Sequence, residues 1–370
     1  MPATKDESNG PIALNGRFLA QPVTGVQRYA LEILNAAERL AAIGQWPATE
    51  ILTPPIPPGE SLAADHHFPV REVGRSTGQR WEQTELFRHA KPHLLLSLGN
   101  TAPILSGGRQ IVVIHDAGAF DTPESYSFPF RNWYKFLHRR LAGVGARIVT
   151  VSRFSQHRLA ERLRVPAETI TVVREGADHI LRVPPEPQVL ARNDLEPGRF
   201  AFAVGSRAAH KNLGALRSAA EQLSKRKMKL AIAGALDTNV FRSGADGVGF
   251  DVTALGRVSD GELRTLYENA VALLFPSRYE GFGLPAVEAL ACGCPLIAAG
   301  GHSVEEVCAG AALFFDPADR EGAGNMVARL LDHEDLSREL TNNGKSIVAN
   351  ITWENAARDL AAVTRNMSVA

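Results

Sequence analysis

Two acidic residues, Glu280 and Glu288, flank a glycine loop in the sequence E-G-F-G-L-P-A-V-E. Pro285 suits the first position of a helix, because its missing N–H would have no partner within the helix there. We therefore predict a helix over residues 286–292. The backbone amides before it would lie at a helix N-terminus, where hydrogen bonds and the macrodipole both stabilise a diphosphate.

The two carboxylates would repel a phosphate, so their expected partners are hydroxyl groups. An ionised carboxylate accepts several hydrogen bonds and can hold two neighbouring hydroxyls at once. Sugars and ribose both carry such pairs of hydroxyls. The segment therefore predicts a site for a sugar nucleotide.

The longer text E-G-F-G-L-P-A-V-E-A-L-A-C-G-C-P resembles the E-x7-E signature of glycosyltransferase family 4, whose members are retaining enzymes of the GT-B fold. The resemblance implies that Glu280 contacts the donor sugar and that Glu288 holds the ribose hydroxyls. It also implies that sugar and phosphate meet the backbone amides of four residues: Gly281, Phe282, Gly283 and Leu284. An ordinary strand, loop and helix with surface carboxylates is the structural alternative.

Positive charge for a diphosphate is available in the text G-S-R-A-A-H-K at residues 205–211. Lys211 matches the family lysine that touches the diphosphate and stabilises the departing nucleotide, as a fixed charge does at a reacting centre. The family often has an arginine directly before this lysine, where this sequence has His210. Arg207 is the other candidate for the second phosphate contact, and the sequence leaves that choice open. A solvated basic turn is the structural alternative.

Two further candidates follow apolar runs, where strands are expected to end. His115 comes directly after residues 111–114, and Ser152 follows residues 148–151. The resemblance implies that a histidine at the position of His115 contacts the donor sugar near its 6-hydroxyl, and that Ser152 matches a second family position. His115 could instead be a structural histidine, and Ser152 a helix N-cap.

The text T-G-V-Q at residues 24–27 has the pattern of a capping box, and the apolar residues after it follow helical spacing. The surrounding text resembles the N-terminal donor loop of family 4, which implies that the backbone at Gly25 approaches the donor. Val258 lies in G-R-V-S-D-G-E-L, which is similar to the family segment that lines the nucleotide base. Glu175 stands where many relatives have asparagine, which puts a carried-over role there in question.

Composition limits the classes of function. The 370 residues include 40 basic and 40 acidic ones, so a general nucleic-acid role is not expected. No run has the roughly 18 apolar residues of a membrane span, and the polar start has no apolar signal segment, so we expect a cytosolic protein. Three cysteines are too few for a disulfide framework or a zinc cluster. The metal-diphosphate motif Asp-x-Asp does not occur, so we expect neither a metal nor a cofactor beyond the donor.

Short apolar runs alternate with helical stretches, which predicts an α/β protein with parallel sheets. The runs are residues 111–114, 148–151, 202–204, 230–233, 272–275 and 295–298. With the resemblance, we expect the GT-B fold, in which two doubly wound, Rossmann-like domains face each other across a cleft. The expected boundaries are 1–182 for the acceptor-side domain, 183–198 for a proline-rich linker, 199–352 for the nucleotide-sugar domain, and 353–370 for a helix that crosses back to the first domain.

The sequence thus indicates a retaining glycosyltransferase that moves a hexose from a UDP- or GDP-sugar to a hydroxyl acceptor by a same-face, metal-independent route. The resemblance implies a polyprenyl-diphosphate-linked saccharide of a bacterial surface polysaccharide as the acceptor. Residues 131–144 combine aromatic and basic side chains, a pattern compatible with the inner face of an anionic membrane or with a solvated helix. A sugar-nucleotide 2-epimerase, a catalytically silent binding protein and a soluble-acceptor transferase of the sucrose, trehalose or glycogen type are the alternatives.

Overall fold

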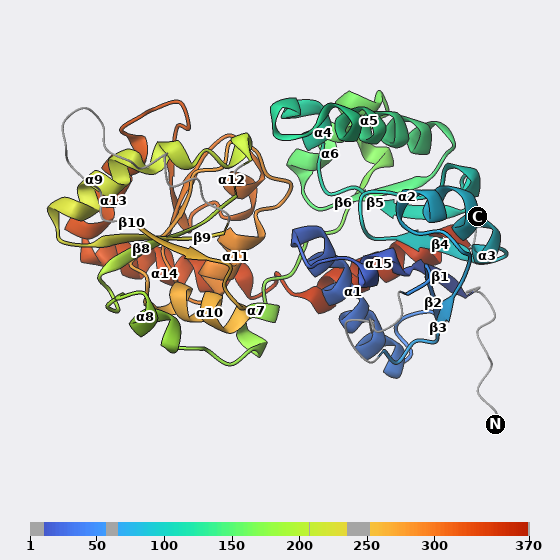
Figure 1. Ribbon diagram of the computed structural model, residues 1–370, viewed down its shortest axis with the longest axis horizontal. Helices are drawn as coiled ribbons and strands as arrows, with labels where there is room; N and C mark the ends of the chain where they lie inside the picture. The colour runs from blue at the N-terminus through green and yellow to red at the C-terminus, as the bar shows by residue number, and fades with distance from the viewer. Residues whose placement is uncertain (1–10, 57–65, 207, 235–251, 369–370) are drawn as a thin grey trace. The chain divides into compact units, whose positions relative to one another are not determined.

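The computed structural model describes residues 11–56, 66–206, 208–234 and 252–368. The chain divides into two compact units. Unit 1 runs up to Asp121 and adds Ser127–Gly176 and the segment from Trp353 onward. Unit 2 consists of Thr122–Tyr126 and Ala177–Thr352. Each unit is built on one parallel sheet covered by helices (Figure 1).

Unit 1 has a seven-stranded parallel sheet in the order β3-β2-β1-β4-β5-β6-β7. Leu14 in β1 lies opposite Ile51 in β2 and Leu96 in β4, and all three side chains are buried. Helices cover both faces of such a sheet, so its strands are apolar without alternation. The strands are β1 Ile12–Asn15, β2 Thr49–Thr53, β3 Val70–Glu72, β4 Leu94–Ser97, β5 Gln110–Val113, β6 Arg147–Thr150 and β7 Thr171–Val172. The helices are α1 Gly25–Ala42, α2 Gly78–Trp81, α3 Phe87–Ala90, α4 Gly118–Asp121, α5 Phe128–Gly143, α6 Arg153–Leu163 and α15 Trp353–Ser368.

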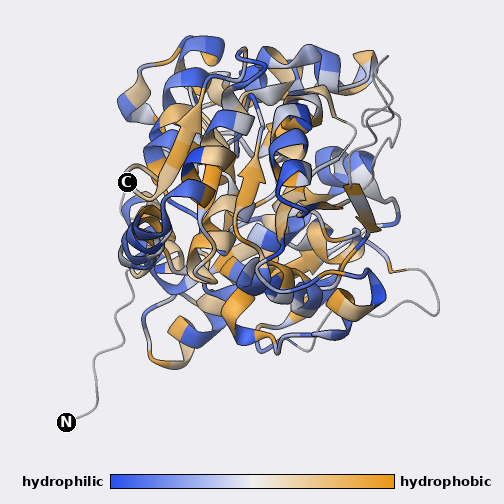
Figure 2. Ribbon diagram, turned by 90° about the vertical axis from the view of Figure 1, so that its left-hand side faces the viewer, coloured by the Kyte–Doolittle hydropathy of each residue, from blue (hydrophilic) through white to orange (hydrophobic). Residues whose placement is uncertain are grey.

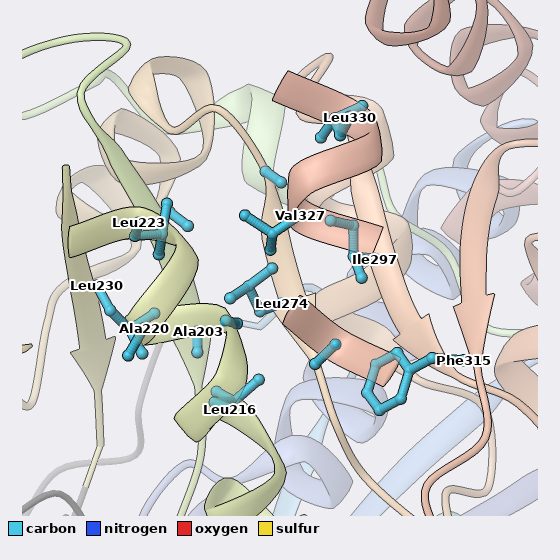
Figure 3. Close-up of a cluster of buried hydrophobic side chains, with 14 of the residues drawn as sticks. Ala203, Leu216, Ala220, Leu223, Leu230, Leu274, Ile297, Phe315, Val327 and Leu330 are labelled. Carbon is cyan, nitrogen blue, oxygen red and sulfur yellow. The ribbon is translucent and has the colours of Figure 1, made fainter. Parts of the chain in front are cut away.

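Unit 2 has a six-stranded parallel sheet in the order β10-β9-β8-β11-β12-β13. Figure 3 shows part of its core, where Ala203 of β8 and Leu274 of β11 lie under α9 and α13. The strands are β8 Phe200–Val204, β9 Lys229–Ala233, β10 Val252–Gly256, β11 Leu273–Phe275, β12 Leu296–Ala299 and β13 Ala312–Phe315. The helices are α7 His179–Arg182, α8 Gln188–Arg192, α9 Arg217–Lys225, α10 Asp260–Asn269, α11 Leu284–Ala291, α12 Ser303–Val307, α13 Gly322–Asp332 and α14 Glu334–Val348.

The division of apolar and polar residues explains why both sheets lie inside. Figure 2 shows strands coloured as hydrophobic, covered by helices on which hydrophobic and hydrophilic residues alternate. In α1 the residues Tyr29, Ile33, Leu34 and Leu40 are buried, at the spacing of one helix face. The helix predicted from this spacing is confirmed.

The six apolar runs read from the sequence correspond to β5, β6, β8, β9, β11 and β12, so the expected parallel α/β architecture is confirmed. The C-terminal helix is also confirmed, since α15 packs against α1 within unit 1. Trp353 is fully buried there, with its ring 5.7 Å from the ring of Tyr29.

Two local expectations differ from the structure. The hydroxyl of Thr24 contacts the side chain of Gln27, and no side chain caps the start of α1, so the capping box is absent. The expected linker, residues 183–198, belongs to unit 2, because the chain leaves unit 1 at Gly176. The guanidinium of Arg264 donates to the carbonyl of Val183, and the Glu186 amide donates to the carbonyl of Gly261, which holds this segment against α10.

Candidate active site

Lys211 and Glu280, both predicted as site residues, meet at the topological switch point of the unit 2 sheet, between β8 and β11. Strands β8 and β11 are neighbours at the centre of the sheet, and the carboxyl ends of such strands are where ligands bind in open α/β sheets. Lys211 follows β8 and Glu280 follows β11. Lys211 Nζ lies 2.7 Å from Glu280 Oε1, within hydrogen-bonding distance.

Opposing effects set the charge of Glu280. Burial alone would raise its pKa, but the ammonium group of Lys211, the nearby Ser277 and the His210 ring together hold the pKa below its ordinary value. The carboxylate is therefore ionised at neutral pH. The side chains of Lys211 and Glu280 remain 22% and 14% exposed, so both groups reach the surface.

The loop after Glu280 leads into α11 as the sequence predicts. Gly283 caps this helix with φ at 96°, a left-handed conformation that favours glycine. A Cβ atom at this position would also lie 2.3 Å from a methyl group of Val304. Leu284 and Pro285 begin the helix. Pro285 has no N–H, and the amides of Ala286 and Val287 donate to the carbonyl of Gly283, so the amide that the first turn offers to a ligand at the positive end of the helix is that of Leu284. Gly281 and Phe282 are buried.

Two residues from elsewhere hold the loop that carries Glu280. The hydroxyl of Ser303 donates to the carbonyl of Glu280 at 2.8 Å. His302 Nε2 lies 2.7 Å from the carbonyl of Ser277, and its Nδ1 accepts from the amide of Val304. Burial lowers the pKa of His302, so the ring is neutral with its proton on Nε2. Neither contact is predicted by a local pattern in the sequence.

The second predicted glutamate has protein partners on both carboxylate oxygens. Glu288 Oε1 lies 2.9 Å from Nε2 of His179, and Oε2 accepts from the hydroxyl of Tyr267 at 3.0 Å. Burial and the charge of Glu288 raise the pKa of Tyr267 well above its ordinary value, so this hydroxyl stays protonated and donates. The sequence analysis named Glu288 and missed both partners.

In unit 1 the predicted histidine is buried and tied to its surroundings. His115 follows β5, is 6% exposed, and donates its backbone N–H to the side chain of Asn100 at 2.8 Å. Its Nε2 lies 3.1 Å from the carbonyl of Leu98, and its Nδ1 lies 3.3 Å from Oε1 of Glu175. The ring of Tyr29 meets it edge-on at 4.6 Å. Glu175, whose role was in question from the sequence, is therefore the carboxylate partner of His115.

The other predicted residues of unit 1 are separate from this pair. Ser152 is the N-cap of α6, where its hydroxyl oxygen accepts from the Ser155 amide at 3.0 Å. That is the structural role the sequence left open. Gly25 is the exposed first residue of α1, and a Cβ atom there would have open space for 4 Å. Protein packing thus gives no reason for glycine at this position.

Three candidates remain for unit 2. Arg207 lies outside the described residues. His210 Nδ1 lies 2.9 Å from the hydroxyl oxygen of Ser125. Val258 is half-buried in the loop between β10 and α10. Of the basic candidates in unit 2, Lys211 contacts Glu280 and His210 contacts Ser125.

Unit 1 also contains a buried ion pair that the sequence analysis missed. Glu82 is fully buried and lies 3.1 Å from the guanidinium of Arg17. Asn15 at the end of β1 donates to Glu82 at 2.7 Å, and the hydroxyl of Thr101 donates to it at 2.8 Å. Burial raises the pKa of Glu82 although Arg17 opposes the shift. The pair lies where β1 and β4 end, at the reversal point of the first sheet.

The comparisons with known proteins agree with this arrangement. Residues 190–347 match the family described as Glycosyl transferases group 1, and residues 23–180 match Glycosyltransferase Family 4. The chain belongs to this family of glycosyltransferases.

Two relatives and one solved structure are similar to this glycosyltransferase over most of its length. The glycosyltransferase is 29% identical over 264 residues to O-antigen chain mannosyltransferase B of Escherichia coli, which covers 67% of this chain and 68% of the relative. It is 26% identical over 242 residues to the O-antigen chain mannosyltransferase RfbU of Salmonella typhimurium, with 64% of each covered. The match thus spans about two thirds of these relatives. HepE of Anabaena, in complex with UDP-glucose, has a TM-score of 0.69 at 16% identity and covers 96% of this chain and 98% of its own, which shows the GT-B fold.

His138, a buried histidine that contacts Asn100 as His115 does, gives a test of the electrostatics near the site. His138 in α5 bonds through Nε2 to the carbonyl of Asn100 at 2.9 Å, and burial lowers its pKa from 6.5 to about 4. The unfolded chain binds a proton near pH 6.5 that the native chain does not bind, so stability falls as pH drops from about 6.5 to about 4.

We expect His138→Gln to flatten this part of the stability profile, because glutamine can donate to Asn100 and does not titrate. In urea unfolding at pH 7, 6 and 5, the wild type should lose about 1.4 kcal/mol more per pH unit than the variant between pH 6 and 5. Parallel profiles for the two proteins would show that His138 binds its proton equally in the native and unfolded chains, which contradicts a pKa lowered by burial.

Proposed function

We propose that this glycosyltransferase moves a hexose from a nucleoside diphosphate sugar to a hydroxyl group of an acceptor. The observation that carries the proposal is the Lys211–Glu280 pair beside the first amides of α11. A donor offers hydroxyls, which suit the ionised carboxylate, and an anionic diphosphate, which suits the ammonium group and the helix N-terminus.

Mannose is the sugar we propose first, since the two relatives described above are named mannosyltransferases of O-antigen chains. The base would be guanine or uracil, as in the GDP- and UDP-sugars. For the acceptor we propose a lipid-linked saccharide in the assembly of a bacterial surface polysaccharide. The names of these two relatives support that choice, because the O-antigen chain is a bacterial surface polysaccharide.

The mechanism we propose retains the configuration at the sugar. The bond between the anomeric carbon and the diphosphate breaks, and the acceptor oxygen forms its bond on the same face. The acceptor proton passes to an oxygen of the departing diphosphate, so no separate protein base is required. Glu280 would position the sugar hydroxyls and Lys211 would stabilise the charge that develops on the leaving group.

The negative charge that develops on the leaving group must be stabilised. We propose that Lys211 and the amide N–H groups at the start of α11 stabilise it without a metal. Among the described residues, no three His, Cys, Asp or Glu side chains gather as metal ligands would. A preorganised ammonium group in a partly buried site can stabilise a transition state by several kcal/mol. Val258 of unit 2 is a further donor contact in this proposal.

Removal of the Lys211 charge tests the assignment. We expect Lys211→Ala to lower kcat for sugar transfer by about 10²- to 10³-fold, the usual cost of one lost charge-stabilising group. The donor is GDP-mannose, or whichever sugar nucleotide the wild type uses. Lys225→Ala is the matched control, because Lys225 is an exposed lysine at the end of α9 in the same unit. Glu280→Ala should also reduce turnover.

Product analysis by NMR completes this experiment. Transfer with an unchanged anomeric configuration is the expected result. Turnover that survives in both Lys211→Ala and Glu280→Ala would remove the roles given to these residues. A new epimer formed from a UDP-sugar without any acceptor would replace the transferase proposal by a sugar-nucleotide epimerase.

A lipid-linked acceptor requires that the protein reach a membrane surface, and α5 is the segment we propose for this contact. Its 16 residues contain the basic residues Arg131, Lys135, Arg139 and Arg140 and no acidic residue. Phe128 is 68% exposed and Phe136 is 51% exposed, whereas Leu137 and Leu141 are buried in the core of unit 1. The exposed aromatics and the positive charge suit an anionic lipid surface.

This contact would be peripheral. Among the helices that the structure describes, none combines the length and the apolar content that crossing a membrane requires. The basic residues would attract anionic headgroups, and each contributes about 1 kcal/mol near such a surface.

We expect the wild type to float with vesicles of phosphatidylglycerol and to stay behind with vesicles of phosphatidylcholine. The double variant Arg139→Ala, Arg140→Ala should bind the anionic vesicles roughly thirtyfold more weakly, because two charges of about 1 kcal/mol each are lost. The control variant Arg320→Ala, Arg338→Ala removes two exposed arginines of unit 2. Equal flotation of both double variants would rule out α5 as the membrane contact.

A further inference from the structure

Glu288 is held by two side chains that come from different helices. His179 is the first residue of α7, Tyr267 lies in α10, and Glu288 lies in the second turn of α11. The two contacts, at 2.9 and 3.0 Å, use one carboxylate oxygen each. All three residues are buried, with exposures of 5% for His179, 0% for Tyr267 and 5% for Glu288.

These contacts leave the carboxylate able to accept more. Two oxygens offer about four lone-pair positions, and His179 and Tyr267 take one on each oxygen. Side chains of a helix tilt toward its N-terminus, so the carboxylate of Glu288 is directed back toward the end of α11 where Gly283 lies. The side chain of Glu288 remains 7% exposed.

We propose that His179 and Tyr267 are positioning residues that hold the Glu288 carboxylate so that it accepts both ribose hydroxyls of the nucleoside diphosphate. This inference rests on the proposed function, because it requires a nucleotide donor at α11. A glutamate free to change its rotamer would lose conformational entropy when it bound the ribose. Two fixed donors remove that freedom before the nucleotide arrives and align the remaining lone pairs.

The anchoring of α7 supports a fixed rather than an adjustable contact. His179 lies three residues after Gly176, the point at which the chain enters unit 2. At that point the amide of Ala177 donates to the carbonyl of Ile351 at 2.9 Å, next to the place where the chain leaves the unit again. The imidazole is therefore carried by a helix whose preceding backbone is held by a hydrogen bond two residues before His179.

A plain structural cross-link among α7, α10 and α11 is the competing explanation, and nucleotide analogues separate the two. The probes are GDP and UDP, each paired with its 2′,3′-dideoxy analogue, and the affinities are measured by isothermal titration calorimetry. The wild type should bind the ribonucleotide at least about tenfold more tightly than the dideoxy analogue, since bonds to an ionised acceptor are among the stronger ones.

Tyr267→Phe removes one donor and keeps the shape of the side chain. We expect it to weaken the ribonucleotide by about five- to tenfold, the range of one lost hydrogen bond, and to change the affinity for the dideoxy analogue by less than about twofold. Tyr29→Phe is the matched control, since its hydroxyl is also buried and has no hydrogen-bond partner among the described residues. That variant should leave both nucleotide affinities unchanged.

A second pair of variants at His179 guards against a folding defect at position 267. His179→Gln keeps an N–H donor and should retain most of the preference for ribose, whereas His179→Leu should lose it. Thermal unfolding and far-UV circular dichroism report whether each variant is folded. Rescue of the preference by glutamine alone is a result that a merely structural role would not produce.

The outcomes are distinguishable. Equal losses for the ribonucleotide and the dideoxy analogue in Tyr267→Phe and His179→Leu would overturn the positioning role. A wild type that binds both nucleotides equally would show that Glu288 does not contact the ribose, and the proposed transferase function would stand without this inference. A wild type that binds neither GDP nor UDP would contradict the proposed function itself.

Discussion

The salt bridge between Lys211 and Glu280 is the interaction on which the account of this protein depends. Removing two opposite charges from water costs several kcal/mol each, and their attraction recovers that cost only with good geometry. A partly buried pair is therefore weak evidence for stability. Its presence at the reversal point of the sheet, with Nζ and Oε1 2.7 Å apart, is better explained by chemistry that needs both signs of charge at one place.

The two units differ in how far their ion pairs are buried. Each unit contains an ion pair between a basic residue that follows a central strand and a glutamate. Arg17 after β1 pairs with Glu82, which precedes β4, and Lys211 after β8 pairs with Glu280, which follows β11. Glu82 is fully enclosed, and its burial raises its pKa. Glu280 reaches the surface, and its pKa is lowered. Unit 1 thus carries a pair with a fully buried glutamate, and unit 2 carries an accessible pair.

Local patterns were sufficient for much of this fold. Apolar runs located six strands, and helical spacing located α1 and α15, because burial on parallel sheets imposes those patterns directly. The capping box at Thr24 failed because the hydroxyl found a side chain instead of a backbone amide. The proline-rich stretch after residue 183 resembled a linker, yet Arg264 and Gly261 hold it in unit 2.

The site was less predictable, since its contacts join residues far apart in the sequence. A motif named Glu280 and Glu288, and a second motif named Lys211, but no local pattern shows that His179 lies against Glu288 across 109 positions. Glu175 gained its partner His115 across 60 positions. Such contacts follow from the order of the strands, which places loops of distant sequence at one edge of a sheet.

A crystal structure of the protein with the nucleoside diphosphate it binds would test the central claim most directly. The account predicts diphosphate oxygens within hydrogen-bonding distance of the Leu284 amide and of Lys211 Nζ, with the sugar hydroxyls of an intact donor on Glu280. A diphosphate bound elsewhere in the protein, with the first amides of α11 in contact with none of its oxygens, would contradict it.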